Sequence, residues 1–323
     1  MDIYPIKFTP ILKEKMWGGT KLRGQFNKVS EYENTGESWE ISDVEGNISV
    51  VSNGVYKGRD LRSLLKNFRA DFIGKANFKK FGSDFPLLIK FIDAAQDLSI
   101  QVHPDDALAK ERHNSFGKTE MWYVMEAEKD ARLIVGFNNK IDKETYMNLL
   151  EEKNIMSVMN EIPVFPGDTF FIETGTVHAI GAGTVIAEIQ QTSDITYRIY
   201  DFDRVDKTTG KTREVHTELA VDALNYSQID NAKRDYKLVE NEMVETVSCP
   251  YFTTNILDLN GEVSLDYSAT DSFVIFMCVE GEAIVEVNGI AEHIKKGETI
   301  LIPAAAIDVN LKAHSAKLLE VTV

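Results

Sequence analysis

Short apolar runs that alternate with polar positions make up most of the chain. The alternation is clearest in LSIQVH (98–103), and runs such as EMWYVM (120–125) and TVIAEIQQ (184–191) are rich in β-branched and aromatic residues. Side chains of a strand point alternately to its two faces, so this pattern predicts β-strands. Further strands are predicted at 84–93, 131–137, 168–173, 194–202, 251–259, 272–281, 282–289 and 298–303.

A helical repeat of apolar positions occurs in only four segments. The first is 58–74, and the second is 104–112, where a proline stands in the predicted first turn with acidic residues behind it. Segments 142–153 and 216–226 follow, and we expect Asp142 and Thr217 to cap them. The chain is therefore predicted to be mainly β with a few added helices.

Two stretches of the chain resemble each other. FPGDTFFIETGTVHAI (165–180) and KKGETILIPAAAIDVN (295–310) share a glycine, an acid, a threonine, a short apolar strand and a small-residue turn. Each copy follows a pair of strands, which predicts two cupin-like jelly-roll β-barrels. We expect a catalytic domain at 1–235, with helical insertions at about 58–80 and 140–160, and a degenerate cupin-like barrel at 236–323.

Composition narrows the classes of function. The net charge is −16 over 323 residues, which argues against a general nucleic-acid or anionic-membrane surface. No apolar run reaches the roughly 18–20 residues of a membrane span, and no signal-peptide pattern is seen. Cys249 and Cys278 are in no CxxC spacing. We therefore expect a reduced, cytoplasmic protein without nucleic-acid or membrane partners.

A set of polar residues distinguishes the first repeat from the second. Gln101 and His103 are two apart in a predicted strand and share a face, Glu120 begins another strand, and His178 follows the turn of the repeat. The second copy has Asp308 in place of His178 and no counterpart of Glu120. Two histidines and a glutamate form a catalytic zinc arrangement. Manganese, cobalt, nickel and iron also accept such ligands, and packed or surface histidines are the alternative.

Six motifs follow one another along the chain: FTPILKEKMWGG (8–19), GESWEISD (36–43), LSIQVHPDD (98–106), GKTEMWYV (117–124), GTVHAIGAG (175–183) and QQTSDITYRIYDFDR (190–204). Together they resemble the shorter, bacterial type I phosphomannose isomerases. The resemblance implies a metal-dependent aldose–ketose isomerase that interconverts mannose 6-phosphate and fructose 6-phosphate through an enediol or enediolate. The large helical insert of longer family members is absent from this sequence.

The resemblance also implies roles for individual residues. The metal ligands of the family match Gln101, His103, Glu120 and His178. We expect one divalent ion in each chain, and the resemblance favours Zn²⁺. Arg198 matches the catalytic arginine, and Lys118 matches a lysine that precedes the ligand glutamate by two positions. Arg198 can clamp an oxyanion or a phosphate, and Lys118 can bind phosphate or transfer protons. The expected partner is a small phosphosugar, and the chain is expected to be a monomer or a weak homodimer.

Simpler interpretations of these residues remain open from the sequence. Arg198 can pair with Asp194, Asp201 or Asp203, and Lys118 can be a solvated loop lysine. A cupin with this ligand set can also be a non-haem metal dioxygenase, which calls for an apolar substrate pocket and gives Lys118 and Arg198 no role. A non-catalytic regulator that binds sugar phosphates on the same scaffold is the third possibility.

Overall fold

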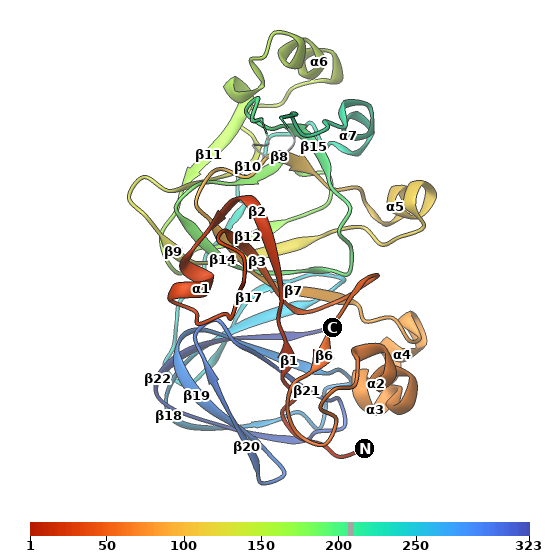
Figure 1. Ribbon diagram of the computed structural model, residues 1–323, viewed down its shortest axis with the longest axis vertical. Helices are drawn as coiled ribbons and strands as arrows, with labels where there is room; N and C mark the ends of the chain where they lie inside the picture. The colour runs from red at the N-terminus through yellow and green to blue at the C-terminus, as the bar shows by residue number, and fades with distance from the viewer. Residues whose placement is uncertain (206–209) are drawn as a thin grey trace.

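The computed structural model describes residues 1–205 and 210–323, and three main sheets form its framework (Figure 1). In strand order, the seven-stranded sheet contains β16 (Lys233–Arg234), β12 (Thr169–Ile172), β9 (Glu120–Ala127), β14 (Thr184–Gln191), β7 (Leu87–Ala94), β2 (Ile11–Gly19) and β3 (Thr35–Ile41). The five-stranded sheet contains β11 (Met159–Pro163), β10 (Arg132–Phe137), β13 (His178–Ile180), β8 (Ile100–Val102) and β15 (Tyr197–Tyr200). These two sheets face each other and are called the first barrel below.

The third sheet forms the C-terminal barrel, at the lower end of Figure 1. It contains β17 (Met243–Ser248), β18 (Thr253–Asp266), β22 (Asp308–Thr322), β19 (Val274–Val287) and β20 (Ile290–Lys295), and β21 (Thr299–Ile302) pairs with β19. Two small ladders pair β1 (Phe8–Thr9) with β6 (Val50–Val51) and β4 (Asp43–Val44) with β5 (Asn47–Ile48). The mainly β, cupin-like fold predicted from the sequence is confirmed.

The hydrophobic clusters show how the sheets are stacked. Ile92, Trp122 and Ile186 of the seven-stranded sheet meet Leu133 and Ile180 of the five-stranded sheet inside the first barrel. The opposite face of the seven-stranded sheet packs on the C-terminal barrel and on the helices near residues 61–81. Because the seven-stranded sheet is covered on both faces, its strands β3, β7 and β14 are buried along their full length.

The helices lie around this framework. They are α1 (Lys21–Gly24), α2 (Leu61–Phe68), α3 (Ala70–Ile73), α4 (Lys75–Phe81), α5 (Asp106–His113), α6 (Lys143–Glu151) and α7 (Thr217–Ala223), with a 3-10 turn, η1, at Ile155–Val158. Figure 1 shows α6 and α7 at the end of the molecule away from the C-terminal barrel. In the described residues, no helix is long and apolar enough to cross a membrane.

All four predicted helical segments contain helix, but details differ. The single helix expected at 58–74 is two helices, because Arg69 between them has a positive φ of 51°. Pro104 precedes the N-cap residue Asp105 instead of standing in the first turn, so that expectation was wrong. Asp142 caps α6 as predicted, by accepting a hydrogen bond from the Thr145 N–H. His216, not Thr217, occupies the N-cap of α7, without a side-chain bond.

The internal repeat has a structural counterpart in each barrel. Gly167 and Gly297 precede strands β12 and β21 and have positive φ values of 96° and 83°. His178 and Asp308 then begin the next strands, β13 and β22. The predicted domain boundary at 235/236 stays a prediction, since one hydrophobic cluster contains residues from both sides of it.

Candidate metal centre and active-site cleft

Strand pairing brings the predicted site residues into two facing rows. In the five-stranded sheet, His178 and Arg198 are both register partners of Gln101, on its two sides. In the seven-stranded sheet, Trp122 pairs with Glu188 and Glu188 pairs with Lys90. Paired residues project from the same face of a sheet. The interior of the first barrel therefore carries polar groups on both of its walls.

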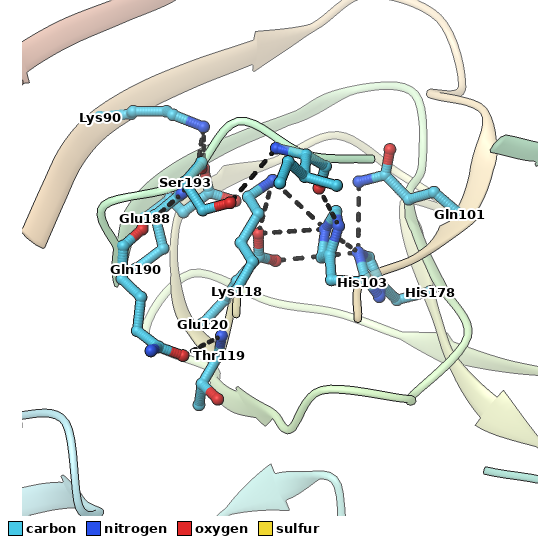
Figure 2. Close-up of polar contacts among 12 residues, drawn as sticks. Lys90, Gln101, His103, Lys118, Thr119, Glu120, His178, Glu188, Gln190 and Ser193 are labelled. Atoms are coloured by element: carbon cyan, nitrogen blue, oxygen red, sulfur yellow. Dashed lines mark hydrogen bonds and ion pairs between the residues drawn. The ribbon is translucent and has the colours of Figure 1, made fainter. Parts of the chain in front are cut away.

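His103, Glu120 and His178 form a compact buried cluster (Figure 2). The Nε2 atoms of the two histidines are 3.1 Å apart, and Glu120 Oε1 lies 3.3 Å from His103 Nε2. Glu120 Oε2 is 3.8 Å from His178 Nε2, and each side chain is at most 1% exposed. Gln101 Nε2 is 3.2 Å from His178 Nε2, at the edge of the cluster. All four predicted ligand residues thus lie together.

The outer nitrogens of both rings fix their tautomers. His103 Nδ1 lies 2.9 Å from the carbonyl oxygen of Ile195, and His178 Nδ1 lies 2.8 Å from that of Thr176. A carbonyl can only accept, so each Nδ1 carries the proton and donates it. The Nε2 atoms of the neutral rings are then lone-pair donors that converge on Glu120. This backbone orientation of a histidine is usual for metal ligands.

The electrostatics of the cluster keep the ligand atoms free of protons. Burial, together with the positive charge of Lys118, lowers the pKa of His103 to about 3. Burial also lowers the pKa of His178. Burial alone would raise the pKa of Glu120, but the positive charge of Lys118, together with the neighbouring His103 and His178, outweighs it and holds that pKa well below its usual value. Neutral imidazoles beside a carboxylate are the protonation states that bind a divalent cation.

The carboxylate of Glu120 provides the test of whether a metal fits. Both of its oxygens are fully buried and lack a hydrogen bond of good geometry within the described residues. A buried, ionised and unsatisfied carboxylate is costly unless a cation balances it. Lys118 Nζ, 3.0 Å from Oε1, supplies part of that balance. Two neutral imidazoles and this carboxylate form a donor set suited to zinc and similar ions. Gln101 faces the cluster with its amide Nε2, so it would join as a ligand only with the amide turned to present its oxygen.

Lys118 is not a solvated loop lysine. Its side chain is 6% exposed, and its Nζ lies 3.0 Å from Glu120 Oε1 and 3.2 Å from His103 Nε2. Lys118 also lines the neighbouring cleft. The ammonium group therefore stands at the border between the cluster and the cleft.

Arg198 lies on the cleft wall of β15, and Tyr197 and Ile199 are buried on the opposite face of the strand. Its NH1 group donates to the Glu214 carbonyl at 2.7 Å, and its buried Nε has no hydrogen-bond partner among the described residues. Asp201, a candidate partner from the sequence, instead accepts bonds from Arg204 and Arg213. Burial, with the nearby Arg213, lowers the pKa of Arg198 from its ordinary value. Among the residues that the structure describes, no aspartate forms an ion pair with the Arg198 guanidinium.

The cleft next to the cluster has a volume of about 480 Å³. Its charged lining contains six basic and three acidic side chains, namely Lys13, Lys15, Lys90, Lys118, Arg198 and Arg213 with Glu37, Glu188 and Asp194. This excess of positive charge contrasts with the net charge of −16 of the whole chain. The cleft therefore has a locally positive lining on an acidic protein.

Trp39, Lys90 and Glu188 in the cleft were missed from the sequence as site residues. Lys90 Nζ lies 2.9 Å from Glu188 Oε2 and 5.4 Å from the centroid of the Trp39 ring, while the Trp122 N–H donates to Glu188 at 2.9 Å. Burial raises the pKa of Glu188. Trp39 and Trp17 line the cleft although both are buried.

Almost the whole chain is similar in sequence to proteins of one known family. Residues 6–145 match the family model described as phosphomannose isomerase type I, catalytic domain, and residues 242–322 match mannose-6-phosphate isomerase, cupin domain. The chain is 36% identical over 318 residues to mannose-6-phosphate isomerase ManA of Bacillus subtilis, covering 98% of each chain. It is 38% identical over 300 residues to the mannose-6-phosphate isomerase of Streptococcus mutans, covering 93% of this chain and 92% of that one.

A solved structure gives the same result. The crystal structure of the mannose 6-phosphate isomerase from Bacillus subtilis matches with a TM-score of 0.89 at 34% identity and covers 99% of this chain and 100% of that one. The resemblance inferred from the six sequence motifs is confirmed.

Proposed function

The chain belongs to the type I phosphomannose isomerase family, and from this membership we propose that it interconverts mannose 6-phosphate and fructose 6-phosphate in a metal-dependent reaction. One observation carries the proposal beyond the family relationship. Two imidazole lone pairs and an unsatisfied carboxylate converge in a buried cluster at the border of a basic cleft. The proposed metal site and the proposed anion site thus adjoin each other.

His103, Glu120 and His178 would hold one divalent ion, with Gln101 as a weaker fourth ligand. Zn²⁺ is the ion we favour, because histidine nitrogen and carboxylate oxygen suit it and the cluster contains no thiolate. A bound ion would supply Lewis-acid polarisation of the sugar carbonyl and would orient C1 and C2.

The reaction moves a proton from C2 to C1 of the open-chain sugar, with an enediolate between the two steps. Arg198 is permanently charged and only half-buried, with its guanidinium at the cleft. It would donate hydrogen bonds to the oxyanion as the charge on that oxygen grows. Lys118, at the border of cluster and cleft, would donate to a sugar oxygen and hold the oxygens in line for the transfer.

The remaining basic residues of the cleft suit the phosphate of the substrate. Among the described residues, the Lys13 side chain hydrogen-bonds only to a neutral group, the Asn47 side chain, and its Nζ lies 4.8 Å from the centroid of the Trp39 ring. Its charge is therefore available to an anion. Lys15 and Lys90 are paired with Glu37 and Glu188 and contribute to the positive field of the site.

The polar character of the cleft argues against the dioxygenase alternative. A non-haem dioxygenase of this fold would need an apolar substrate pocket, whereas six basic side chains line this one. A regulator that binds sugar phosphates without turnover shares the basic cleft, and activity alone distinguishes it. The cytoplasmic location and the monomeric or weakly dimeric state stay predictions.

A coupled assay tests the proposed function. Mannose 6-phosphate is supplied to the zinc-loaded protein, and fructose 6-phosphate is followed through a linked dehydrogenase reaction. We expect turnover with mannose 6-phosphate and little with unphosphorylated mannose, because the cleft is built for an anion. Binding of mannose 6-phosphate without any fructose 6-phosphate would instead establish the regulator.

A further inference from the structure

Asp106 joins three segments that are distant in the sequence. Its Oδ1 accepts the backbone N–H of Gly117 at 2.8 Å and the side-chain amide of Gln191 at 3.0 Å. Its Oδ2 accepts the hydroxyl of Tyr251 at 2.8 Å. Gly117 begins the segment that leads into Glu120, Gln191 ends β14, and Tyr251 lies in the loop between β17 and β18 of the C-terminal barrel.

The backbone at Gly117 rests directly on the start of α5. A Cβ at this position would lie 2.8 Å from the Asp106 nitrogen and 2.9 Å from the carbonyl carbon of Asp105. No side chain fits there, so the glycine permits the close approach that its N–H needs to reach the Asp106 carboxylate. The bond and the contact together determine where segment 117–120 begins.

Gln191 holds the same segment from the other side. Its side-chain Oε1 accepts the backbone N–H of Thr119 at 2.9 Å, and its backbone N–H donates to the Thr119 carbonyl at 3.1 Å. Gln191 is 4% exposed, and its Nε2 is directed at Asp106 while its Oε1 is directed at Thr119. Asp106 therefore also orients the side-chain amide of Gln191, which accepts the hydrogen bond from Thr119.

We infer that Asp106 is a positioning residue that holds segment 117–120, and with it Lys118 and Glu120, and that Tyr251 ties this segment to the C-terminal barrel. The inference rests on the proposed function for its catalytic consequence. Glu120 would be a metal ligand and Lys118 a substrate contact, and a displacement of about 1 Å in such groups is costly to catalysis. The C-terminal barrel thereby helps to shape a site to which it contributes no cleft-lining residue.

The neighbouring aspartate provides a matched control. Asp105 caps α5 by accepting the Leu108 N–H at 2.8 Å and makes no hydrogen bond to segment 117–120 among the described residues. Asp106→Ala removes the bonds to Gly117, Gln191 and Tyr251, whereas Asp105→Ala removes only the helix cap. Asp106→Asn keeps Oδ1 for the first two bonds, and its amide can donate to the Tyr251 oxygen.

Three readouts separate positioning from general stability. In Asp106→Ala we expect faster amide hydrogen exchange at 117–119, a 10- to 100-fold weaker affinity for Zn²⁺ and a similar fall in kcat with KM changed less than about threefold. Asp106→Asn should stay within about threefold of the unmodified protein in both constants. Asp105→Ala should lower the melting temperature without changing kcat or the affinity for Zn²⁺.

Tyr251→Phe tests the link to the C-terminal barrel and is a mild change if Asp106→Ala fails to fold. It removes one hydroxyl, and we expect faster exchange at Gly117 and a fall in kcat of about fivefold, the size of one lost hydrogen bond. Unchanged exchange, metal affinity and kcat in Tyr251→Phe would overturn the link. The same result in Asp106→Ala, or equal losses in Asp105→Ala and Asp106→Ala, would overturn the positioning role. If the unmodified protein showed no isomerase activity, the proposed function would fail, and the exchange and Zn²⁺ measurements would still decide the inference.

Discussion

The Nε2 atoms of His103 and His178 lie 3.1 Å apart in the buried interior of the first barrel, and neither carries a proton to share with the other. Each ring donates its N–H to a backbone carbonyl oxygen. The Nε2 lone pair of His103 faces Lys118 Nζ at 3.2 Å and that of His178 faces Gln101 Nε2 at 3.2 Å. Beside the Glu120 carboxylate, two such lone pairs form a donor set that suits a divalent cation.

This arrangement predicts the effect of removing one imidazole. His103→Ala should abolish tight metal binding and isomerase activity together, because a carboxylate and a single imidazole hold a divalent ion weakly. Metal content by elemental analysis and turnover in the coupled assay measure both. His293→Ala is the matched control, since His293 is an exposed histidine of the C-terminal barrel paired with Glu282. A His103→Ala protein that kept a full equivalent of metal and its activity would remove the assignment.

Arg198 carries the second prediction. Arg198→Ala should lower kcat by about 100- to 1,000-fold, the effect of removing one preorganised oxyanion donor. Metal content and folding should stay unchanged, because the Arg198 side chain donates to the Glu214 carbonyl and makes no hydrogen bond to Glu120, His103 or His178 among the described residues. A rise in KM at constant kcat would assign Arg198 to phosphate anchoring instead. If neither constant moved, Arg198 would have no role in the reaction.

Lys13 carries the third prediction, which concerns substrate binding. Lys13→Ala should raise KM for mannose 6-phosphate by about 10- to 100-fold with little change in kcat, as expected for the loss of a hydrogen bond to a charged group. The dependence of KM on salt should weaken at the same time. Steady-state kinetics at two ionic strengths measure both effects. An unchanged KM would place the phosphate elsewhere in the cleft.

The C-terminal barrel carries the fourth prediction. Asp308, at the position of His178 in the repeat, is exposed at the start of β22. We expect the protein to bind one ion per chain, and Asp308→Ala to leave metal content and kcat unchanged. A second equivalent of tightly bound metal that Asp308→Ala removes would contradict this.

Much of the site could be predicted from the sequence because of the internal repeat. Glu120 and His178 are the places where two similar barrels differ in chemistry, and the Gln-x-His pair shares a face of a strand. The structure brings these four side chains together from three different strands and the residue after one of them. Comparing the two repeats of the chain thus identified these residues without any knowledge of the distances between them.

Lys90 and Glu188 could not be found in the same way. Their strands, β7 and β14, belong to a sheet that is covered on both faces, so the apolar residues do not alternate and no face is marked as interior to the first barrel. Only the cross-strand register, which pairs Lys90 with Glu188, brings the charges together. The break between α2 and α3 at Arg69 could not be predicted either, because no glycine or proline occupies that position.

Removal and return of the metal tests the central claim most directly. The protein is stripped with a chelator, its folding is checked by circular dichroism, and Zn²⁺ is added back in steps while fructose 6-phosphate formation from mannose 6-phosphate is followed. The account predicts no turnover without metal, activity that rises in proportion to added Zn²⁺, and a plateau at one equivalent per chain. Full turnover by the folded, metal-free protein would contradict it.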